Sequence, residues 1–142
     1  MYSFALFYIH GIVQNLENLK QGMVIIFLTM AIKNWHIIAK GSKDRFRDFV
    51  YIDDAVDVVL LSVNYDNDFS IYNVCIGKPT KVENVISQIL FTLNDYSITV
   101  DCTTGTPDDQ FGIVGNNQII IINELRWFPK YDFSEGMTKM IS

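Results

Sequence analysis

The sequence predicts an α/β fold, because stretches with helical periodicity alternate with short strand-like runs. At 45–50 arginine alternates with aromatic and aliphatic residues, as in a strand with one buried face, and 55–63 is then almost entirely apolar. Apolar residues at 82–93 recur at i, i+3 and i+4, which is the spacing of an amphipathic helix. The run at 71–74 lies between turn-rich segments and is too short for a helix, so a strand is expected there.

Length and composition indicate one folded domain over residues 1–142 that binds no nucleic acid. Hydrophobic residues make up 49% of the 142, enough for a proper core. The net charge of −5 and the lack of a basic run leave no footprint for a phosphate backbone. Cys75 and Cys102 have neither metal-ligand spacing nor a disulfide-rich context. We therefore expect both to be buried structural residues of a cytoplasmic protein.

The first third of the chain is apolar but predicts neither a secretion signal nor a membrane span. Residues 1–13 have no positively charged start and no small-residue cleavage site. The run at 23–32 is shorter than the roughly 20 residues that cross a bilayer. Its spacing predicts instead an amphipathic helix over 16–33 with a core-facing stripe, followed by a strand at 36–39.

The change of pattern in the middle of the chain predicts a strand at 48–52 and a helix over 54–64. Asp53 and Asp54 are favourable N-cap residues, and Asp57 lies where a capping box has its acid. The helix that follows them is apolar at nearly every position, so it is expected to be buried.

A strand at 71–74 and a helix over 81–94 come next. Thr80 and Glu83 have the spacing of a capping box, in which the threonine accepts from the third amide and the glutamate reaches back to the cap. This is the most regular helical pattern in the chain, so its apolar stripe is expected to face the core.

The last part of the chain predicts a strand at 98–102, a loop, and two helices over 117–125 and 134–141. Asn116 or Asn117 is suited to cap the first of these helices. Four consecutive isoleucines inside it favour a strand locally, because β-branched residues prefer extended backbone. The family resemblance described next favours the helix.

Four segments resemble, in the same order, motifs of the NAD-dependent epimerase/dehydratase family, the extended short-chain dehydrogenases that include UDP-glucose 4-epimerase. Residues 45–54 resemble its Arg-Asp-Phe-Val-Tyr-Val-Asp-Asp string, and 14–18 the end of its Asn-x-Tyr-Gly-Pro-x-Gln-Asn segment. Residues 71–77 resemble its Tyr-Asn-Val-x-x-Gly strand, and 124–129 its Leu-Gly-Trp-x-Pro end. The resemblance implies the sugar-nucleotide-binding, C-terminal portion of a Rossmann-type enzyme.

The resemblance also implies a substrate site for a nucleotide-sugar such as UDP-glucose. Arg47 and Phe49 lie in the matching string, and the arginine fork suits phosphate oxygens. Lys40 stands where family members stack on the uracil or thymine ring, which lysine cannot do. Asp109 matches the acid of an Arg-Pro-Gly-Asp motif that holds the ribose side or a backbone turn, but Thr106 replaces the arginine that would add a second grip on the diphosphate.

Two absences limit the chemistry that the chain is expected to perform. It has no Gly-rich turn to hold a dinucleotide pyrophosphate, and none of its seven tyrosines is followed four residues later by lysine. We therefore expect no bound NAD and no catalysis by this chain alone, although the family uses NAD. A separate N-terminal half, or a homo-oligomer, is the expected partner.

Other family positions have been lost, and they leave three readings open. At 8–14 the substrate-facing asparagine and the turn proline are absent, and Arg126 replaces a glycine. The first hypothesis is a nucleotide-sugar-binding portion that works with a separate cofactor half. The second is a non-catalytic binding or regulatory module, and the third is a truncated remnant without ligand. For Arg47 the alternative is a salt bridge to an acid such as Asp48 or Asp53, and His10 and His36 are expected to be packing or surface residues.

Overall fold

A computed structural model describes residues 2–12, 22–65, 70–107, 109–116 and 118–142, without the side chains of 118–120. The helices are α1 (Met23–Asn34), α2 (Ile52–Val63), α3 (Val82–Leu93), α4 (Gln118–Leu125) and α5 (Phe133–Ile141). The strands are β1 (Tyr2–Leu6), β2 (Tyr8–His10), β3 (His36–Lys40), β4 (Phe46–Arg47), β5 (Phe49–Tyr51), β6 (Ser70–Val74), β7 (Thr80–Lys81) and β8 (Thr99–Thr103).

The predicted α/β class is confirmed, and the two N-terminal strands are the main addition to it. All five predicted helices are present within a few residues of their expected ends, except that 16–21 of the first lie outside the described residues. Strands β1 and β2 were not predicted. Their partners, β6 and β5, lie 40 or more positions away, so their apolar sequence alone does not reveal the pairing.

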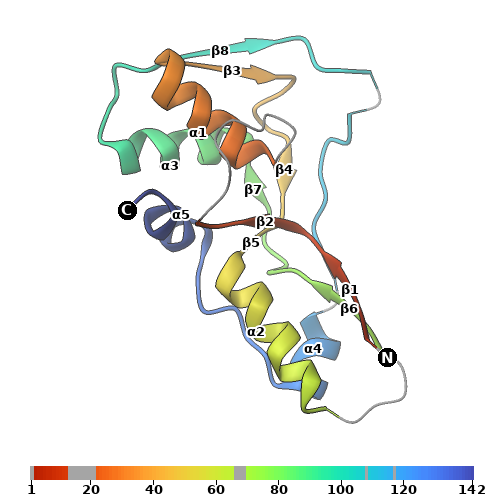
Figure 1. The fold of residues 1–142 in the computed structure, drawn as a ribbon. Helices are drawn as coiled ribbons and strands as arrows, with labels where there is room; N and C mark the ends of the chain where they lie inside the picture. Colours follow the sequence, from red (N-terminus) through yellow and green to blue (C-terminus); the bar gives the residue numbers. More distant parts are fainter. Residues whose placement is uncertain (1, 13–21, 66–69, 108, 117) are drawn as a thin grey trace.

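The strands pair over long distances in the sequence and are mostly parallel. Strand β1 pairs with β6, β2 with β5 and β3 with β8, each in parallel, whereas the short β4 and β7 are antiparallel. Strand β2 follows β1 almost directly, so the β1–β6 and β2–β5 pairs lie in succession along the molecule (Figure 1). Helices α1 and α3 with β3 and β8 lie at one end, and α2 and α4 with β1 and β6 lie at the other.

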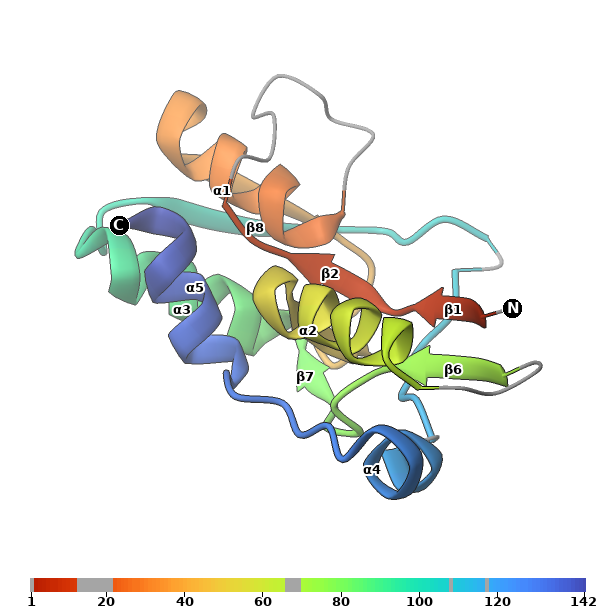
Figure 2. The ribbon, with the colours of Figure 1, turned by 60° about the horizontal axis from the view of Figure 1, so that its bottom comes forward.

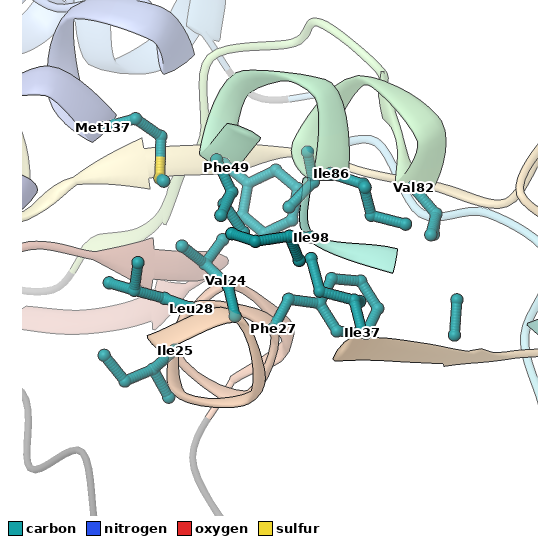
Figure 3. Packing of buried hydrophobic residues seen from close by; sticks show 14 residues of the cluster. Val24, Ile25, Phe27, Leu28, Ile37, Phe49, Val82, Ile86, Ile98 and Met137 are labelled. Carbon is teal, nitrogen blue, oxygen red and sulfur yellow. The ribbon is translucent and has the colours of Figure 1, made fainter. Parts of the chain in front are cut away.

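The larger apolar cluster, which we call the helical core, lies between α1, α3, α5 and strands β3 and β5. Figure 3 shows side chains from these elements around Phe49. Its buried members are Val24, Ile25, Phe27, Leu28, Ala31, Ile37, Ala39, Phe49, Val82, Val85, Ile86, Ile89, Ile98 and Met137. The i, i+3, i+4 stripe of α3 thus faces the core, as its sequence predicted.

The smaller cluster, the strand core, lies where α2 and α4 pack against β5 and β6 (Figure 2). Its buried members are Val50, Ala55, Val58, Tyr72, Val74, Ile121, Leu125 and Trp127. The fully buried Asp54 ties the segment after α4 to α2: its carboxylate accepts from the amides of Lys130 at 2.9 Å and Tyr131 at 3.1 Å, and its carbonyl accepts from Trp127 Nε1 at 3.1 Å. Burial is the main cause that raises the pKa of Asp54.

The predicted cap of α2 is wrong. The N-cap of α2 is Tyr51, without a side-chain cap bond. Asp53 and Asp54 lie in the first turn, where carboxylates favour the helix dipole, and Asp57 forms an ion pair with Lys130.

The predicted cap of α3 is also wrong, because strand pairing takes the cap residue. Thr80 belongs to β7, opposite Arg47, and the N-cap of α3 is Lys81. The first amides of α3, from Val82 and Glu83, donate instead to the carbonyls of Arg45 at 2.8 Å and Lys43 at 3.1 Å. The backbone carbonyls of the segment before β4 therefore cap the N-terminus of α3.

Helix α5 carries a capping box that the sequence reasoning missed. Asp132 accepts from the amide of Glu135 at 2.8 Å, and the Glu135 carboxylate accepts from the amide of Asp132 at 2.9 Å. The spacing of these two residues is the usual three, so the signal was present in the sequence.

Candidate anion-binding site

Arg47, at the end of β4, is a buried cation held by the chain's own oxygen atoms. Its side chain is only 6% exposed. Nη1 donates to the carbonyl of Phe46 at 2.8 Å and weakly to that of Phe111 at 3.4 Å, and Nη2 donates to the carbonyl of Gln110 at 2.9 Å. The carbonyls of 110–111 thus fix the position of the guanidinium beside the loop that contains Asp109.

Asp109 lies between two guanidinium groups. Its Oδ1 is 3.5 Å from Arg47 Nη2, and its Oδ2 forms an ion pair with Arg45 Nη1. The acid that pairs with Arg47 is therefore Asp109. A salt bridge between Arg47 and an acid was the alternative expected from the sequence, with Asp48 and Asp53 as examples. Asp48 and Asp53, the two acids named for that pairing, take other places in the structure.

Arg45 is the site residue that the sequence reasoning missed. It is buried, its Nε donates to the carbonyl of Ser42 at 3.2 Å, and its Nη2 donates to the carbonyl of Lys40. Burial, and then the neighbouring charge of Arg47, lower the pKa of Arg45 from its usual value. The signal for it was available: residues two apart in an extended segment share a face, which places Arg45 and Arg47 together.

Close backbone packing brings the two halves of this site together. Strand β3 pairs with β8 as far as Lys40 opposite Thr103, and the amide of Gly41 donates to the Thr103 carbonyl at 2.8 Å. A Cβ on Gly105 would lie 3.2 Å from the Cα of Gly41, whose φ of +81° also favours glycine. Glycine at both positions lets the loop with Asp109 approach Arg45.

Lys40 and Phe49 differ in how they relate to this site. Lys40 is exposed and reaches the arginine pair through its carbonyl. Phe49 is buried in the helical core, where its ring meets those of Tyr8, His10 and Phe133. The structure thus gathers Lys40, Arg47 and Asp109 in one place and puts the Phe49 ring in the core; a ligand contact for any of the four stays a prediction.

Asp48 has a structural role that the sequence reasoning did not assign. It is fully buried and accepts from the amides of Ile76 at 2.9 Å, Gly77 at 2.8 Å and Gly115 at 3.0 Å. One carboxylate thus connects β4 and β5 to the turn after β6 and to the segment before α4. This network holds the strand on which Arg47 lies.

An open apolar hollow of about 400 Å³ adjoins the arginine site. Its lining residues are Leu6, Phe7, Tyr8 and Ile113. The guanidinium carbon of Arg47 lies 5.4 Å from the centre of the Tyr8 ring, a cation–π contact. The Tyr8 ring therefore packs against the Arg47 side chain and also lines this hollow.

A larger cavity of about 540 Å³ lies elsewhere, between α3 and the segment leading into α5. It is lined by Asn84, Gln88, Lys78 and Asp132 among others, and of the four predicted site residues it includes only Phe49. Asp132 and Glu135 are engaged in the capping box of α5, whereas Lys78, Asn84 and Gln88 add polar side chains to the lining of this cavity.

Metal ligation and membrane insertion find no support in the part of the chain that the structure describes. It contains no group of three His, Cys, Asp or Glu side chains that could hold a metal ion. None of its helices has the length and apolar character of a membrane span. Cys75 is buried as expected, but Cys102 is exposed on β8, which corrects the expectation for that residue.

Comparisons with known proteins agree with the motifs. No protein-family model matches the chain. It is 29% identical to dTDP-4-dehydro-6-deoxyglucose reductase of Escherichia coli over 126 residues, which is 86% of the chain and 38% of the relative. It is 28% identical to a putative UDP-glucose 4-epimerase of Methanocaldococcus jannaschii over 123 residues, which is 85% of the chain and 38% of the relative.

Solved structures show the same partial match. The UDP-glucose 4-epimerase of Thermotoga maritima with UDP-glucose superposes with a TM-score of 0.88 at 20% identity, covering 99% of the chain and 44% of that enzyme. For the Thermus thermophilus UDP-glucose 4-epimerase complex with NAD, the TM-score is 0.82 at 20% identity, with 99% and 45% covered. The chain therefore spans about two fifths of these proteins. In sequence and fold it is similar to part of NAD-dependent sugar-nucleotide epimerases and dehydratases, consistent with their C-terminal portion.

Proposed function

We propose that the chain is the nucleotide-sugar-binding portion of such an enzyme and that Arg47 binds the diphosphate of a UDP-sugar. The observation that carries the proposal is the pair of buried guanidinium groups, Arg45 and Arg47, which share one carboxylate, Asp109. Two cations and one anion leave an excess positive charge in a poorly solvated place. A charged phosphate satisfies such a site better than water does.

The chemistry of the proposed enzyme requires a second polypeptide segment. The Gly-rich turn and the tyrosine–lysine pair that the family resemblance calls for are absent from this sequence. We infer that a cofactor half supplies them. This chain then binds and orients the nucleotide-sugar, and the other half holds NAD and carries the base.

An apolar stripe on the outer side of α2 supports a partner of this kind. The outer α2 stripe consists of Val56, Val59, Leu60 and Val63, which are between 42% and 75% exposed. Their i, i+3, i+4, i+7 spacing places all four on one face of the helix, as in an amphipathic helix that packs against another surface. The β1–β6 pair is parallel, and parallel sheets are normally covered on both faces, yet Ile71, on the face away from the strand core, is 54% exposed. Segments of the cofactor half would cover this face and the outer α2 stripe.

Calorimetry with UDP-glucose tests the proposal. Arg47→Ala removes a charge-assisted contact, so affinity should fall by about tenfold to more than a hundredfold, or roughly 1.5–3 kcal/mol. Arg126→Gly is the matched control: it removes one guanidinium from an exposed position whose φ of +52° glycine adopts without strain. Equal binding by the wild type and Arg47→Ala, or none by a folded wild type, would contradict the proposal.

A second candidate is a non-catalytic binding or regulatory module. Two sequence features favour it, namely Thr106 in place of an arginine and Lys40 in place of an aromatic ring. Two results together would distinguish this candidate. UDP-glucose binding is weakened by Arg47→Ala, and adding a cofactor half produces no turnover of UDP-glucose.

A further inference from the structure

We propose that Asp109 occupies the position of a ligand phosphate, so that Arg45 and Arg47 together form the diphosphate grip and Asp109 competes with the ligand for it. The inference rests on the proposed function and extends it to a second arginine and an internal competitor. It reverses the sign of the effect expected from Asp109, since the family resemblance makes this acid a ligand-holding residue.

The geometry of the carboxylate is the first support. Each oxygen of Asp109 faces a different guanidinium, Oδ1 towards Arg47 and Oδ2 towards Arg45. A phosphate group presents oxygens to two arginines in the same way. The two arginine side chains are 10% and 6% exposed, whereas the Asp109 side chain is 28% exposed. The cations are therefore fixed in the structure, and the anion is the more accessible member.

The contacts of the loop are the second support. Arg45 is fixed by the carbonyls of Ser42 and Lys40, and Arg47 by those of Phe46 and Gln110. None of these bonds involves the Asp109 side chain, and those of Arg45 come from a segment outside the Asp109 loop, so the contacts that hold Arg45 do not depend on the carboxylate.

Binding of inorganic pyrophosphate and of UDP-glucose to wild type and Asp109→Asn tests the inference. Removal of the competing charge should raise the affinity for pyrophosphate by about tenfold or more. Asp101→Asn is the control, because it removes one negative charge from an exposed residue of β8. It should leave the affinity unchanged. Equal or weaker pyrophosphate binding by folded Asp109→Asn overturns the inference.

The two ligands separate this inference from the proposed function. Tighter pyrophosphate binding by Asp109→Asn without any UDP-glucose binding supports the competing carboxylate and contradicts the nucleotide-sugar function. UDP-glucose binding that is weakened by Arg47→Ala but not strengthened by Asp109→Asn supports the function and overturns the inference.

Arg45→Gln gives a second measurement that does not depend on the folding of Asp109→Asn. If Arg45 grips the ligand, this variant should bind pyrophosphate about tenfold more weakly, and Arg45→Lys should recover part of the loss through its point charge. If Arg45→Gln has the circular dichroism and the pyrophosphate affinity of the wild type, Arg45 only holds the loop in place. That result overturns the inference.

Discussion

Helices α2 and α3 are both 12 residues long, yet they face their surroundings in opposite ways. In α3 the buried side is Val82, Val85, Ile86 and Ile89, and the outer positions next to it, Glu83, Asn84 and Ser87, are polar. In α2 the inner side packs in the strand core, and the outer α2 stripe is apolar as well. Apart from Phe91, which is 64% exposed, the apolar residues of α3 pack within this chain, whereas α2 has a second apolar face suited to another surface.

The largest effect that tests this comparison is on stability. Ile89→Ala in α3 empties a fully buried site in the helical core, so the free energy of unfolding should fall by about 2–5 kcal/mol. Leu60→Ala in the outer α2 stripe removes the same kind of side chain from an exposed position, and the change should stay within about 0.5 kcal/mol. Urea denaturation followed by circular dichroism measures both values. Similar losses in the two variants would mean that the stripe is already covered, for example by a second copy.

The next effect is smaller and concerns a weak point beside the helical core. His10 is 1% exposed, and neither ring nitrogen has a hydrogen-bond partner among the described residues. A Cβ at Gly136 would lie 2.5 Å from its Nε2, so α5 closes over the ring only because this residue is glycine. Burial lowers the pKa of His10 from 6.5 to about 4, and the nearby Val50 backbone offsets part of this effect.

The sign of the pH dependence follows from that lowered pKa. Between pH 6.5 and about 4 the unfolded chain binds a proton that the folded chain does not, so stability falls as the pH is lowered through this window. The full loss is roughly 3 kcal/mol, and above pH 6.5 this contribution no longer changes. Urea denaturation between pH 4 and 7.5 measures it, with His10→Phe as the control that removes the titrating group. The same slope in His10→Phe would assign the dependence to other groups.

Local sequence signals predicted the five helices, although not the caps of α2 and α3. The stripe of α3 repeats within one helix, so its buried residues could be read directly. Strands β1 and β2 depend on partners far along the chain, and the same apolar residues would suit a buried helix. Thr80 is a second case in which a distant partner decides the structure. Its spacing from Glu83 is that of a capping box, but Thr80 pairs with Arg47 in the β4–β7 ladder instead.

The candidate site was predictable only where a motif pointed to it. Arg47 and Asp109 came from the family strings, and the structure brings them together. Arg45 matched no motif position, although its spacing from Arg47 placed both on one face. The ion pairs of Asp109 depend on the close approach of the backbones at Gly41 and Gly105, which no local pattern reveals.

The last prediction is that NAD does not bind to this chain. It tests the proposal that the outer α2 stripe packs against a separate cofactor half, because that proposal assumes that the chain has no NAD site of its own. With no Gly-rich turn at a helix start, the chain offers no cradle for the dinucleotide pyrophosphate. Calorimetric titration of the purified chain with NAD should therefore give no saturable signal up to about millimolar concentration, or roughly 4 kcal/mol of binding free energy. The UDP-glucose 4-epimerase of Thermus thermophilus, whose structure is a complex with NAD, is the positive control. Saturable micromolar binding would reveal a dinucleotide site within this chain, and the outer α2 stripe would then need an occupant other than a cofactor half.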